Sequence, residues 1–388
     1  MKLKKDNPQR NISEKCLLIV AGEASGDLLG ESVLNNLTKL YQQKSVRLIT
    51  WGFGGEGLKH AGMRIERDIN ELHVIGFWEA LKNYRRLKKY LNELVIRIQI
   101  EKPDAALLID YPGFNIRLAK KLSEKKVKTF MLVSPQIWAW HYSRIKKIKK
   151  YFSMMFCLYA FETEMYAEEN VPAFFCGHPL VDHVNKSKKK FKTAKLKPER
   201  RKLVTLLPGS RGSEISRHSD FLIKLSEKIH EKYPDIEFIL PTPGKHAARL
   251  LKEFKWPNYV TITNKGTHEA LYSSYVAIAC SGTVTLECGL FGTPFLLIYS
   301  TSPLTYFLAR RLIELPYIGM LNVLAGKYVT KEFIQNEMRL DLVFNEFEKL
   351  YSDRQYRLKM KSDFKQCVKG LGSGRMAEKT SQKLIEII

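Results

Sequence analysis

The chain alternates short apolar runs with amphipathic stretches of helical length. Such alternation is typical of βαβ units, in which helices connect parallel strands. Two series of apolar runs are present, one in each half of the sequence. The first occupies residues 16–21, 46–51, 105–109, 130–133, 154–159 and 174–176, and the second 203–207, 236–240, 260–262, 276–279 and 295–299. We therefore expect an α/β protein with two Rossmann-like parallel-sheet domains that face each other across a cleft.

A strongly basic segment separates the two series. Residues 185–202 contain many Lys and Arg side chains and show no apolar periodicity, so we expect a basic linker there. The first domain is then expected over 1–184 and the second over 203–340. Residues 341–388 predict C-terminal helices that are interrupted near the glycines at 370–374. We expect these helices to pack back on the N-terminal domain.

The first predicted strand and its turn are the first place where chemistry is expected. Residues 16–21 form an unbroken apolar run that ends at Gly22, and Glu23, Ser25 and Asp27 follow. Ligands of open α/β sheets bind beyond the carboxyl ends of the strands, which makes Glu23 and Ser25 candidate ligand contacts. The alternative is that Gly22 only forms a tight turn and that Ser25 or Asp27 only caps the next helix.

Asp110 directly follows the predicted strand at 105–109 and precedes a Pro-Gly turn. A carboxylate at the carboxyl end of a parallel strand faces the ligand crevice and is well placed to act as a general base. The alternative is an aspartate that only stabilises the turn.

Residues 52–57 match the dinucleotide pattern Gly-x-Gly-x-x-Gly. A nucleotide-binding pattern of this kind opens a long helix, whereas here Ala61 and Gly62 follow after only three residues. We therefore expect a glycine-rich loop that lines the cleft rather than a nucleotide site.

Two turns in the second half are suited to phosphate. Ser210 and Arg211 follow the predicted strand at 203–207 and offer backbone N–H groups with a guanidinium that can form forked bonds to phosphate oxygens without a metal. The alternative is a surface turn whose arginine is only solvated.

The second of these turns follows the predicted strand at 276–279. Ser281 and Thr283 precede a helix whose N-terminus can bind a pyrophosphate, and Glu287, one turn later, can bond ribose hydroxyls. The alternative is an ordinary helix N-terminus with no ligand.

Charge and composition restrict the kinds of partner that the protein is expected to bind. The chain has 64 Lys and Arg against 40 Asp and Glu, a net charge of +24. This excess predicts a polyanionic partner, which can be nucleic acid, an anionic membrane surface or a phosphorylated substrate. The six cysteines show no Cys-x-x-Cys pair, and no Asp-x-Asp occurs. We therefore expect no metal site and no cofactor, and a cytoplasmic location.

Residues 77–100 predict a basic amphipathic helix. Its apolar residues include Phe77, Trp78, Leu81 and Tyr84, and lysines and arginines lie between them. Such a helix can lie on an anionic bilayer or receive acyl chains. The alternative is an ordinary surface helix packed on the sheet. No apolar stretch approaches the roughly 18 residues that a membrane-spanning helix needs.

With these motifs in this order, the chain resembles the lipid-A-disaccharide synthases, a family of inverting glycosyltransferases with the GT-B fold. The resemblance extends from the first predicted strand almost to residue 335. It rests on AGEASGDLLG at 21–30, the glycine-rich loop at 52–57, VIGFWEALK at 74–82, SPQIWAW at 134–140, GHPL at 177–180, LLPGSR at 206–211, SGTVTLE at 281–287, PLTYFLARRL at 303–312 and NVLAG at 322–326.

The resemblance implies a reaction and a location. The reaction transfers 2,3-diacylglucosamine from UDP to 2,3-diacylglucosamine 1-phosphate and releases UDP with a β(1→6)-linked tetra-acyl disaccharide 1-phosphate. The first domain would bind the acceptor and the second the UDP-sugar, on the cytoplasmic face of the bacterial inner membrane. Dimers occur in the family, so a homodimer is an expectation, and nucleic acid is not an expected partner.

The resemblance also implies residue roles. Asp110 would take the proton of the acceptor's 6-hydroxyl as it attacks the anomeric carbon, giving inversion in one displacement. Glu23 and Asn322 match family positions that are important for activity and would orient the sugars, Glu23 as a catalytic residue and Asn322 as a substrate-binding one. Where the family usually carries a second acid after Asp110 this chain has Gly113, and Lys327 with the next residue, Tyr328, replaces the usual Arg-Glu.

In the second domain, the resemblance implies donor binding. Arg211 and the helix N-terminus near Ser281 and Thr283 would stabilise the charge on the departing UDP in place of a metal, and Glu287 would hold the ribose.

Two alternatives stay open. A UDP-N-acetylglucosamine 2-epimerase or a cell-wall glycosyltransferase would use the same scaffold on sugars without acyl chains. A nucleic-acid-binding protein would use the basic runs at 144–150 and 186–202, but these contain few aromatic residues for base stacking.

Overall fold

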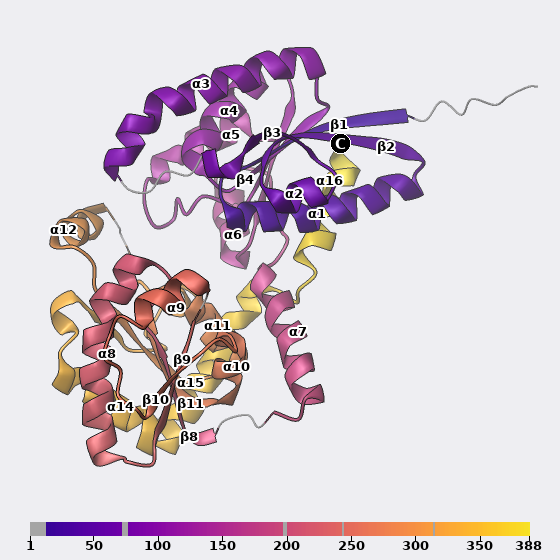
Figure 1. The fold of residues 1–388 in the computed structure, drawn as a ribbon. Helices are drawn as coiled ribbons and strands as arrows, with labels where there is room; N and C mark the ends of the chain where they lie inside the picture. The colour runs from indigo at the N-terminus through magenta and orange to yellow at the C-terminus, as the bar shows by residue number, and fades with distance from the viewer. Residues whose placement is uncertain (1–12, 72–76, 197–199, 243, 313–314) are drawn as a thin grey trace, which may run out of the picture. The chain divides into compact units, whose positions relative to one another are not determined.

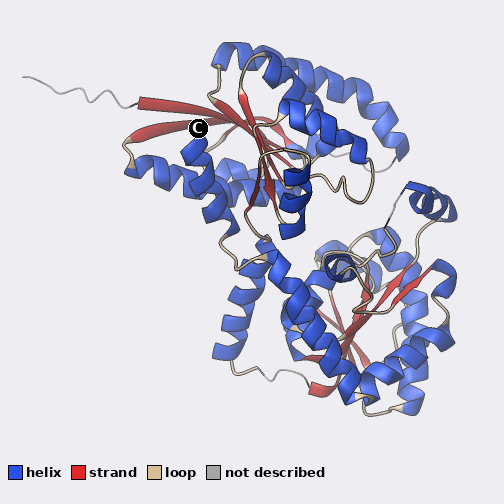
Figure 2. Cartoon of the chain, turned by 180° about the vertical axis from the view of Figure 1, so that it is seen from behind, coloured by secondary structure: helices blue, strands red, loops and turns tan. Residues whose placement is uncertain are grey.

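Two compact units make up the chain. The computed structural model describes residues 13–71, 77–196, 200–242, 244–312 and 315–388. The first unit comprises Met1–Pro179 and Arg375–Ile388, and the second comprises Leu180–Gly374. In each unit, helices cover both faces of a parallel sheet (Figures 1 and 2). This confirms the expected α/β class with two Rossmann-like sheets.

The sheet of the first unit is parallel throughout its described strands, in the order β3-β2-β1-β4-β5-β6-β7. The strands are β1 (Ser13–Ala21), β2 (Val46–Gly54), β3 (Arg64–Asp68), β4 (Ala105–Ile109), β5 (Lys128–Leu132), β6 (Met154–Cys157) and β7 (Ala173–Phe175). Residues 17–21 of β1 and all of β4 are buried. Burial on both faces explains why these segments are uninterrupted apolar runs in the sequence.

Helices cover both faces of this sheet. They are α1 (Ala24–Gln43), α2 (Glu56–His60), α3 (Phe77–Glu101), α4 (Pro112–Glu124), α5 (Ile145–Tyr151), α6 (Ala160–Glu168) and α16 (Met376–Ile387), with 3-10 turns η1 (Ile69–Glu71) and η2 (Tyr142–Arg144). Helices α3, α4 and α5 pack on the face that presents Leu18 and Val20, and α1 and α16 lie on the other face (Figure 1).

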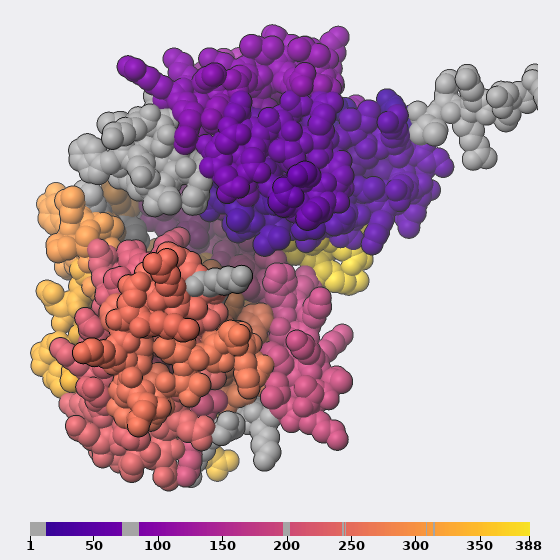
Figure 3. Space-filling model, in the orientation of Figure 1, coloured from indigo at the N-terminus to yellow at the C-terminus, as the bar shows by residue number. Residues whose placement is uncertain are grey.

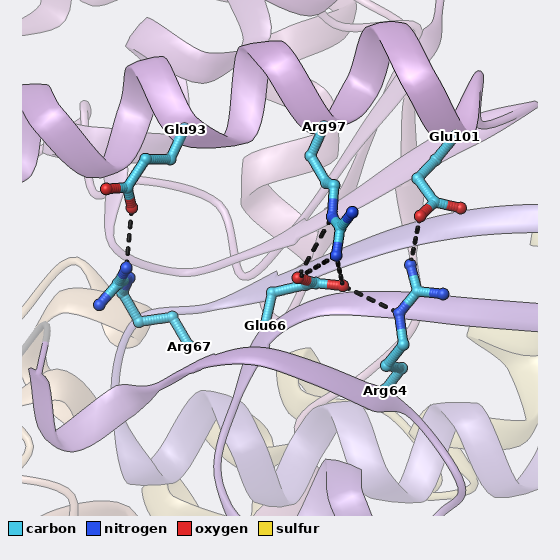
Figure 4. Close-up of polar contacts among 6 residues, drawn as sticks. All are labelled: Arg64, Glu66, Arg67, Glu93, Arg97 and Glu101. Atoms are coloured by element: carbon cyan, nitrogen blue, oxygen red, sulfur yellow. Dashed lines mark hydrogen bonds and ion pairs between the residues drawn. The ribbon is translucent and has the colours of Figure 1, made fainter.

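Three ion pairs fix the C-terminal half of α3 on the edge strand β3 (Figure 4). In order along the helix they are Arg67–Glu93 at 2.8 Å, Glu66–Arg97 at 3.0 Å and Arg64–Glu101 at 2.6 Å. The three helical partners are spaced by four residues and therefore share one face of α3. Each partly exposed pair contributes less than about 1 kcal/mol alone, but the network fixes the direction of the helix.

The sheet of the second unit has the order β10-β9-β8-β11-β12-β13 in its described strands, and all pairs are parallel. The strands are β8 (Arg200–Leu207), β9 (Glu237–Pro241), β10 (Val260–Thr263), β11 (Ser274–Cys280), β12 (Phe295–Tyr299) and β13 (Glu332–Ile334). Numbered within the unit, this is the doubly wound order 3-2-1-4-5-6 of nucleotide-binding folds.

The helices of the second unit complete its two outer layers. They are α7 (Pro179–Thr193), α8 (Gly212–Lys232), α9 (Lys245–Leu251), α10 (Thr267–Ser273), α11 (Val284–Phe291), α12 (Pro303–Leu312), α13 (Met320–Ala325), α14 (Leu340–Ser352) and α15 (Arg354–Cys367), with 3-10 turns η3 (Gln335–Glu337) and η4 (Val368–Leu371).

The segment expected as a linker, 185–202, is helical as far as Thr193. It belongs to α7, which packs on the second unit: the rings of Phe191 and Tyr272 lie 5.2 Å apart, and Lys188 Nζ donates to the Leu290 carbonyl at 2.6 Å. Because lysines outnumber apolar residues in this segment, its sequence shows no clear helical periodicity, although the segment is helical as far as Thr193.

The C-terminal helices divide between the units. Helix α16 packs on α1, where Ser381 Oγ donates to the Val33 carbonyl at 2.9 Å. In the space-filling view the yellow C-terminal residues lie beside the indigo N-terminal ones (Figure 3). Helices α14 and α15 instead contact α8 and α11 within the second unit. Of the segment 341–388, only α16 therefore packs on the first unit in the manner expected for the whole segment.

Candidate active site

Glu23 and Asp110 lie at the point where the strand order of the first sheet reverses. Strands β1 and β4 are neighbours, and Ala21 pairs in register with Ile109. Glu23 and Asp110 therefore follow adjacent strand ends, in the crevice where ligands of doubly wound sheets bind. Glu23 is exposed and Asp110 is partly buried.

The backbone at Asp110 is held in an uncommon conformation. Asp110 and Tyr111 both have a φ of 49°, in the left-handed region. Asp110 N donates to the Leu132 carbonyl at 2.9 Å, and Asn115 Nδ2 donates to the Asp110 carbonyl at 2.6 Å. Asn115 is fully buried. Local strain of this kind persists only where surrounding bonds impose it, and it concentrates at functional sites.

Gly22 allows the turn that carries Glu23 to pack closely on the turn that carries Asp110. A Cβ at Gly22 would lie 2.4 Å from Cγ of Tyr111. The tyrosine ring therefore packs directly on the β1–α1 turn, and its other neighbour is the ring of Phe114, 6.1 Å away. This close approach fixes the turn of Glu23 beside the turn of Asp110.

The surroundings of Asp110 make its carboxylate more basic. Burial raises its pKa, the nearby charge of Glu23 raises it further, and a hydrogen bond from the Tyr111 amide partly opposes both effects. Among the described residues, no cation forms an ion pair with Asp110. A partly buried carboxylate without a counter-ion is the form that a general base requires.

Asp27 binds the glycine-rich loop at 52–57 through backbone amides. Its buried carboxylate accepts hydrogen bonds from the amides of Gly55 at 2.6 Å, Gly57 at 2.8 Å and Leu58 at 3.2 Å. These amides open α2 and are the groups that a pyrophosphate would need. The side chain of Asp27 occupies the place that a pyrophosphate would take, so the glycine-rich loop is hydrogen-bonded to α1. Neither Ser25, which is exposed, nor Asp27 caps its own helix, whose N-cap is Glu23.

The phosphate turn after β8 differs from the expectation in one respect. Glu214 Oε2 accepts the amides of Ser210 at 3.0 Å and Arg211 at 3.2 Å. A carboxylate therefore occupies the backbone donors that the sequence analysis assigned to a phosphate. The Arg211 guanidinium contacts Glu214 at 3.3 Å but is 80% exposed, so it can still bind an anion.

The turn after β11 places its polar residues at the other side of the strand-order reversal. Ser281 Oγ donates to the Ile318 carbonyl at 3.3 Å, and exposed Thr283 precedes α11 without capping it through its side chain. Glu287 was expected to be free for a ribose. In the structure its carboxylate lies 3.6 Å from His268 Nε2, so Glu287 has a protein partner.

Asn322 is enclosed rather than directed at a ligand. Its side chain is fully buried, its Nδ2 donates to the Thr330 carbonyl at 3.0 Å and to Glu332 at 2.7 Å, and its Oδ1 accepts the amides of Val329 at 2.8 Å and Thr330 at 3.0 Å. All four hydrogen-bonding positions of the amide are occupied. The expected role of Asn322 in orienting the sugars stays a prediction, and with these bonds the side chain could serve it only through neighbouring groups.

Asn322 is linked to the β11–α11 turn through Glu332. This buried carboxylate accepts the amides of Ile318 at 3.0 Å and Gly319 at 2.9 Å. Because Ser281 donates to the carbonyl of the same Ile318, a continuous chain of bonds leads from Asn322 to the β11–α11 turn.

His218 ties two further turns together. Ser300 N donates to its Nε2 at 2.9 Å, which requires the neutral ring to carry its proton on Nδ1 and donate it to the Pro208 carbonyl at 2.8 Å. Burial lowers the pKa of His218, which favours this neutral form. The turn that carries Arg211 is thereby fixed to the end of β12.

Comparisons with known proteins decide the family. Residues 17–387 match the family described as lipid-A-disaccharide synthetase. A lipid-A-disaccharide synthase of Coxiella burnetii (strain Dugway 5J108-111) is 36% identical over 349 residues, which cover 89% of this chain and 91% of the relative. One of Geobacter sulfurreducens is 34% identical over 380 residues, with 96% and 97% covered. The chain belongs to the lipid-A-disaccharide synthase family.

Solved structures agree with the fold of a lipid-A-disaccharide synthase. A UDP-GlcNAc 2-epimerase of Neisseria meningitidis superposes with a TM-score of 0.58 at 14% identity, covering 96% of this chain and 100% of the other. The calicheamicin glycosyltransferase gives 0.58 at 12% identity, with 97% and 99% covered. At these identities the likeness is confined to the fold. With the family, it confirms a glycosyltransferase of the GT-B type.

The groups that support the site could not be found from the sequence. Asn115 and Tyr111 stand inside the motif that pointed to Asp110, so their position was visible but their bonds were not. Glu332 and His218 gave no signal, because their partners are backbone groups of distant turns. Phe77, Trp78, Leu81 and Tyr84 lie in α3, but their side chains are outside the described residues.

Within the described residues of this lipid-A-disaccharide synthase, no group of three or more His, Cys, Asp and Glu side chains gathers as a metal site. Over the same residues, every helix is either too short or too polar to cross a bilayer.

Proposed function

We propose that Asp110 is the general base of the disaccharide synthase reaction. It takes the proton of the acceptor's 6-hydroxyl while that oxygen attacks the anomeric carbon of UDP-2,3-diacylglucosamine. One displacement then gives the β(1→6) disaccharide 1-phosphate and UDP. The observation that carries this proposal is a partly buried carboxylate at the strand-order reversal, with a raised pKa and a bonded left-handed backbone.

Glu23 and Ser25 complete the acceptor side. Both are exposed at the turn that Tyr111 packs against, and the charge of Glu23 acts on Asp110. Glu23 increases the basicity of Asp110 and orients the sugar hydroxyls, while Ser25 offers a further hydrogen bond at the same rim.

The second unit binds the donor. The exposed guanidinium of Arg211 stabilises the negative charge that develops on the departing diphosphate, together with Ser210, Ser281 and Thr283 at the neighbouring turns. Fixed donors of this kind act without a metal. Glu287 contacts the ribose from the first turn of α11, in addition to His268.

Membrane attachment is part of the proposal. Helix α12 exposes Leu304, Phe307 and Leu312, and the Arg311 guanidinium lies 4.1 Å from the centre of the Phe307 ring. Exposed apolar and basic side chains on one helix suit an anionic bilayer, from which acylated substrates come. Weaker co-sedimentation of Phe307→Ser with anionic vesicles than of the unaltered protein tests this attachment, and equal binding contradicts it. A homodimer stays a prediction.

The decisive experiment compares Asp110→Asn with the unaltered protein in an assay with both acylated sugars. We expect a loss of about 10²- to 10⁴-fold in kcat, the range of general-base catalysis. The variant should be at least as stable as the parent, because burial and the charge of Glu23 destabilise the ionised form of Asp110 that the substitution removes. Asp220→Asn, an exposed aspartate on α8, is the matched control for the charge change and should retain full activity. Full activity of Asp110→Asn would remove Asp110 as the base.

A further inference from the structure

Three arginines of the first unit lie on α4, the helix that follows Asp110, or on elements that adjoin it. Arg117, on α4, donates to the Gly113 carbonyl at 2.8 Å, which places its guanidinium along the first turn of that helix. Arg144, at the end of η2, lies with its guanidinium 4.9 Å from the centre of the Trp140 ring. Arg86 comes from the N-terminal half of α3, which packs beside α4.

The elements that carry these arginines pack against one another. Helix α4, which carries Arg117, packs against α3, which carries Arg86, and against α5, which begins directly after Arg144. Burial raises the pKa of the Tyr111 hydroxyl and Glu23 raises it further, whereas Arg86 and Arg117 both lower it. Arg117 also acts on Arg144. Two of the three arginines therefore act on the residue that directly follows Asp110, and the third lies near Arg117.

Arg144 lacks the counter-ion that Arg64 and Arg67 of the same unit possess. Burial alone would lower the pKa of Arg64, but Glu101 and Glu66, drawn beside it in Figure 4, raise it overall. Arg67 behaves in the same way with Glu71 and Glu93. Burial lowers the pKa of Arg144, and Arg117 lowers it further. Among the described residues, no carboxylate pairs with Arg144.

The first turn of α4 provides room beside these charges. Helix α4 starts after Tyr111 without a side-chain cap, so its N-terminus presents a partial positive charge. Gly113 in this turn is exposed, and a Cβ there would meet nothing within 4 Å. The free space and the guanidiniums together fit a small, strongly charged anion.

We propose that Arg86, Arg117, Arg144 and the first turn of α4 bind the phosphate group of the acceptor sugar. The inference rests on the proposed function, in which the acceptor's hydroxyl reacts at Asp110. Its phosphate belongs to the same sugar ring, so the phosphate site has to lie near the base, and the first turn of α4 begins two residues after Asp110. Guanidinium groups form forked, charge-assisted bonds to phosphate oxygens. The site would distinguish the phosphorylated acceptor from an unphosphorylated sugar.

The test separates the two substrates kinetically. In Arg144→Gln and in Arg117→Gln we expect the KM for the acceptor to rise about 10- to 100-fold, since a hydrogen bond to a charged group contributes on that order. The KM for the donor should change less than about twofold. Arg85→Gln is the matched control for Arg86→Gln, because Arg85 is also exposed on α3 but does not act on Tyr111. A rise confined to the donor KM would reassign the cluster to the diphosphate and overturn the proposal.

An acceptor without its phosphate gives a second arm. With this analogue the unaltered enzyme should lose at least as much kcat/KM for the acceptor as Arg144→Gln loses with the natural acceptor, because the analogue forgoes all the contacts of the cluster. Arg144→Gln should lose little kcat/KM beyond that when it is given the analogue. Equal effects of the substitution on both acceptors would overturn the proposal, because a merely structural role affects both alike.

A binding measurement separates the failure of this site from the failure of the proposed function. Trp140 contacts Arg144 and is 40% exposed, so its fluorescence reports on the cluster. Titration with glucosamine 1-phosphate should give a saturable change in the unaltered protein, a change weakened in Arg144→Gln and absent with glucosamine. Saturable binding without turnover would refute the transfer reaction and leave the phosphate site. Turnover without phosphate-dependent binding or KM effects would refute the site and leave the reaction.

Discussion

The two units use the same strand-order reversal in opposite ways. In the first unit, the turn after β4 at the reversal and the segment after the neighbouring strand β5 carry charges without counter-ions: Asp110 has a raised pKa, and Arg144 has a lowered one. In the second unit, the corresponding turns are joined by buried groups whose hydrogen bonds are satisfied, chiefly His218 and Glu332.

This difference fits the two tasks that we propose for the units. A base and an anion site must stay reactive until the acceptor arrives, which requires unpaired charge in a partly buried place. A pocket for a nucleotide diphosphate needs donors held in fixed positions, which a bonded network provides. In this proposal the fold supplies the position in both units, and the side chains decide which task each reversal performs.

The largest effect that would test the comparison is a loss of the network in the second unit. Asn322→Ala removes four buried hydrogen bonds and leaves Glu332 without one donor. We expect a destabilisation of the second unit by about 3 to 5 kcal/mol. Hydrogen exchange should show lost protection across residues 318–334 with little change in the first unit.

Asn258→Ala, an exposed turn residue of the same unit, is the control and should change stability by less than about 0.5 kcal/mol. Unchanged protection around β13 in Asn322→Ala would mean that the network does not support the donor turns.

The fold could be predicted from the sequence, and so could the position of Asp110 at a strand end, but the groups that hold these turns in place could not. Unbroken apolar runs such as β4 predict buried parallel strands, and Asp110 follows from its place at a strand end. The role of Asn322 could not be predicted, because burial depends on a tertiary fold that one motif does not specify. Ser210 and Arg211 show the same limit, since their amides are bound by Glu214, three residues beyond Arg211, and only the structure shows the carboxylate turning back.

An intermediate effect concerns Glu162, a buried acid in the first unit. Its carboxylate accepts Trp138 Nε1 at 3.1 Å and the Tyr159 amide at 3.3 Å, yet burial raises its pKa to about 7. Between its ordinary value of 4.5 and about 7, the folded state keeps a proton that the unfolded state releases. The free energy of unfolding should therefore fall as pH rises through this window, by roughly 3 kcal/mol, and level off above it.

Glu162→Gln should remove most of this slope in urea unfolding measured from pH 4.5 to 8. Glu164→Gln, exposed on the same helix, serves as the control and should keep the slope. A slope that persists in Glu162→Gln would mean that another group carries the proton. Glu162 would then no longer count as a buried acid without a counter-ion in the first unit.

The smallest expected effect is the one that Glu23 has on the pKa of Asp110 in the first unit. The charge of Glu23 raises the pKa of Asp110 in addition to burial, so Glu23→Gln should lower that pKa. The acid limb of the kcat/KM profile should move to lower pH by less than about one unit, because burial remains the larger cause. Ser25→Ala removes a polar group from the same turn without changing charge, so it should leave the midpoint in place even if the rate falls. If the limb does not move in Glu23→Gln, the titrating group is not beside Glu23, and Asp110 is not the base that the profile reports.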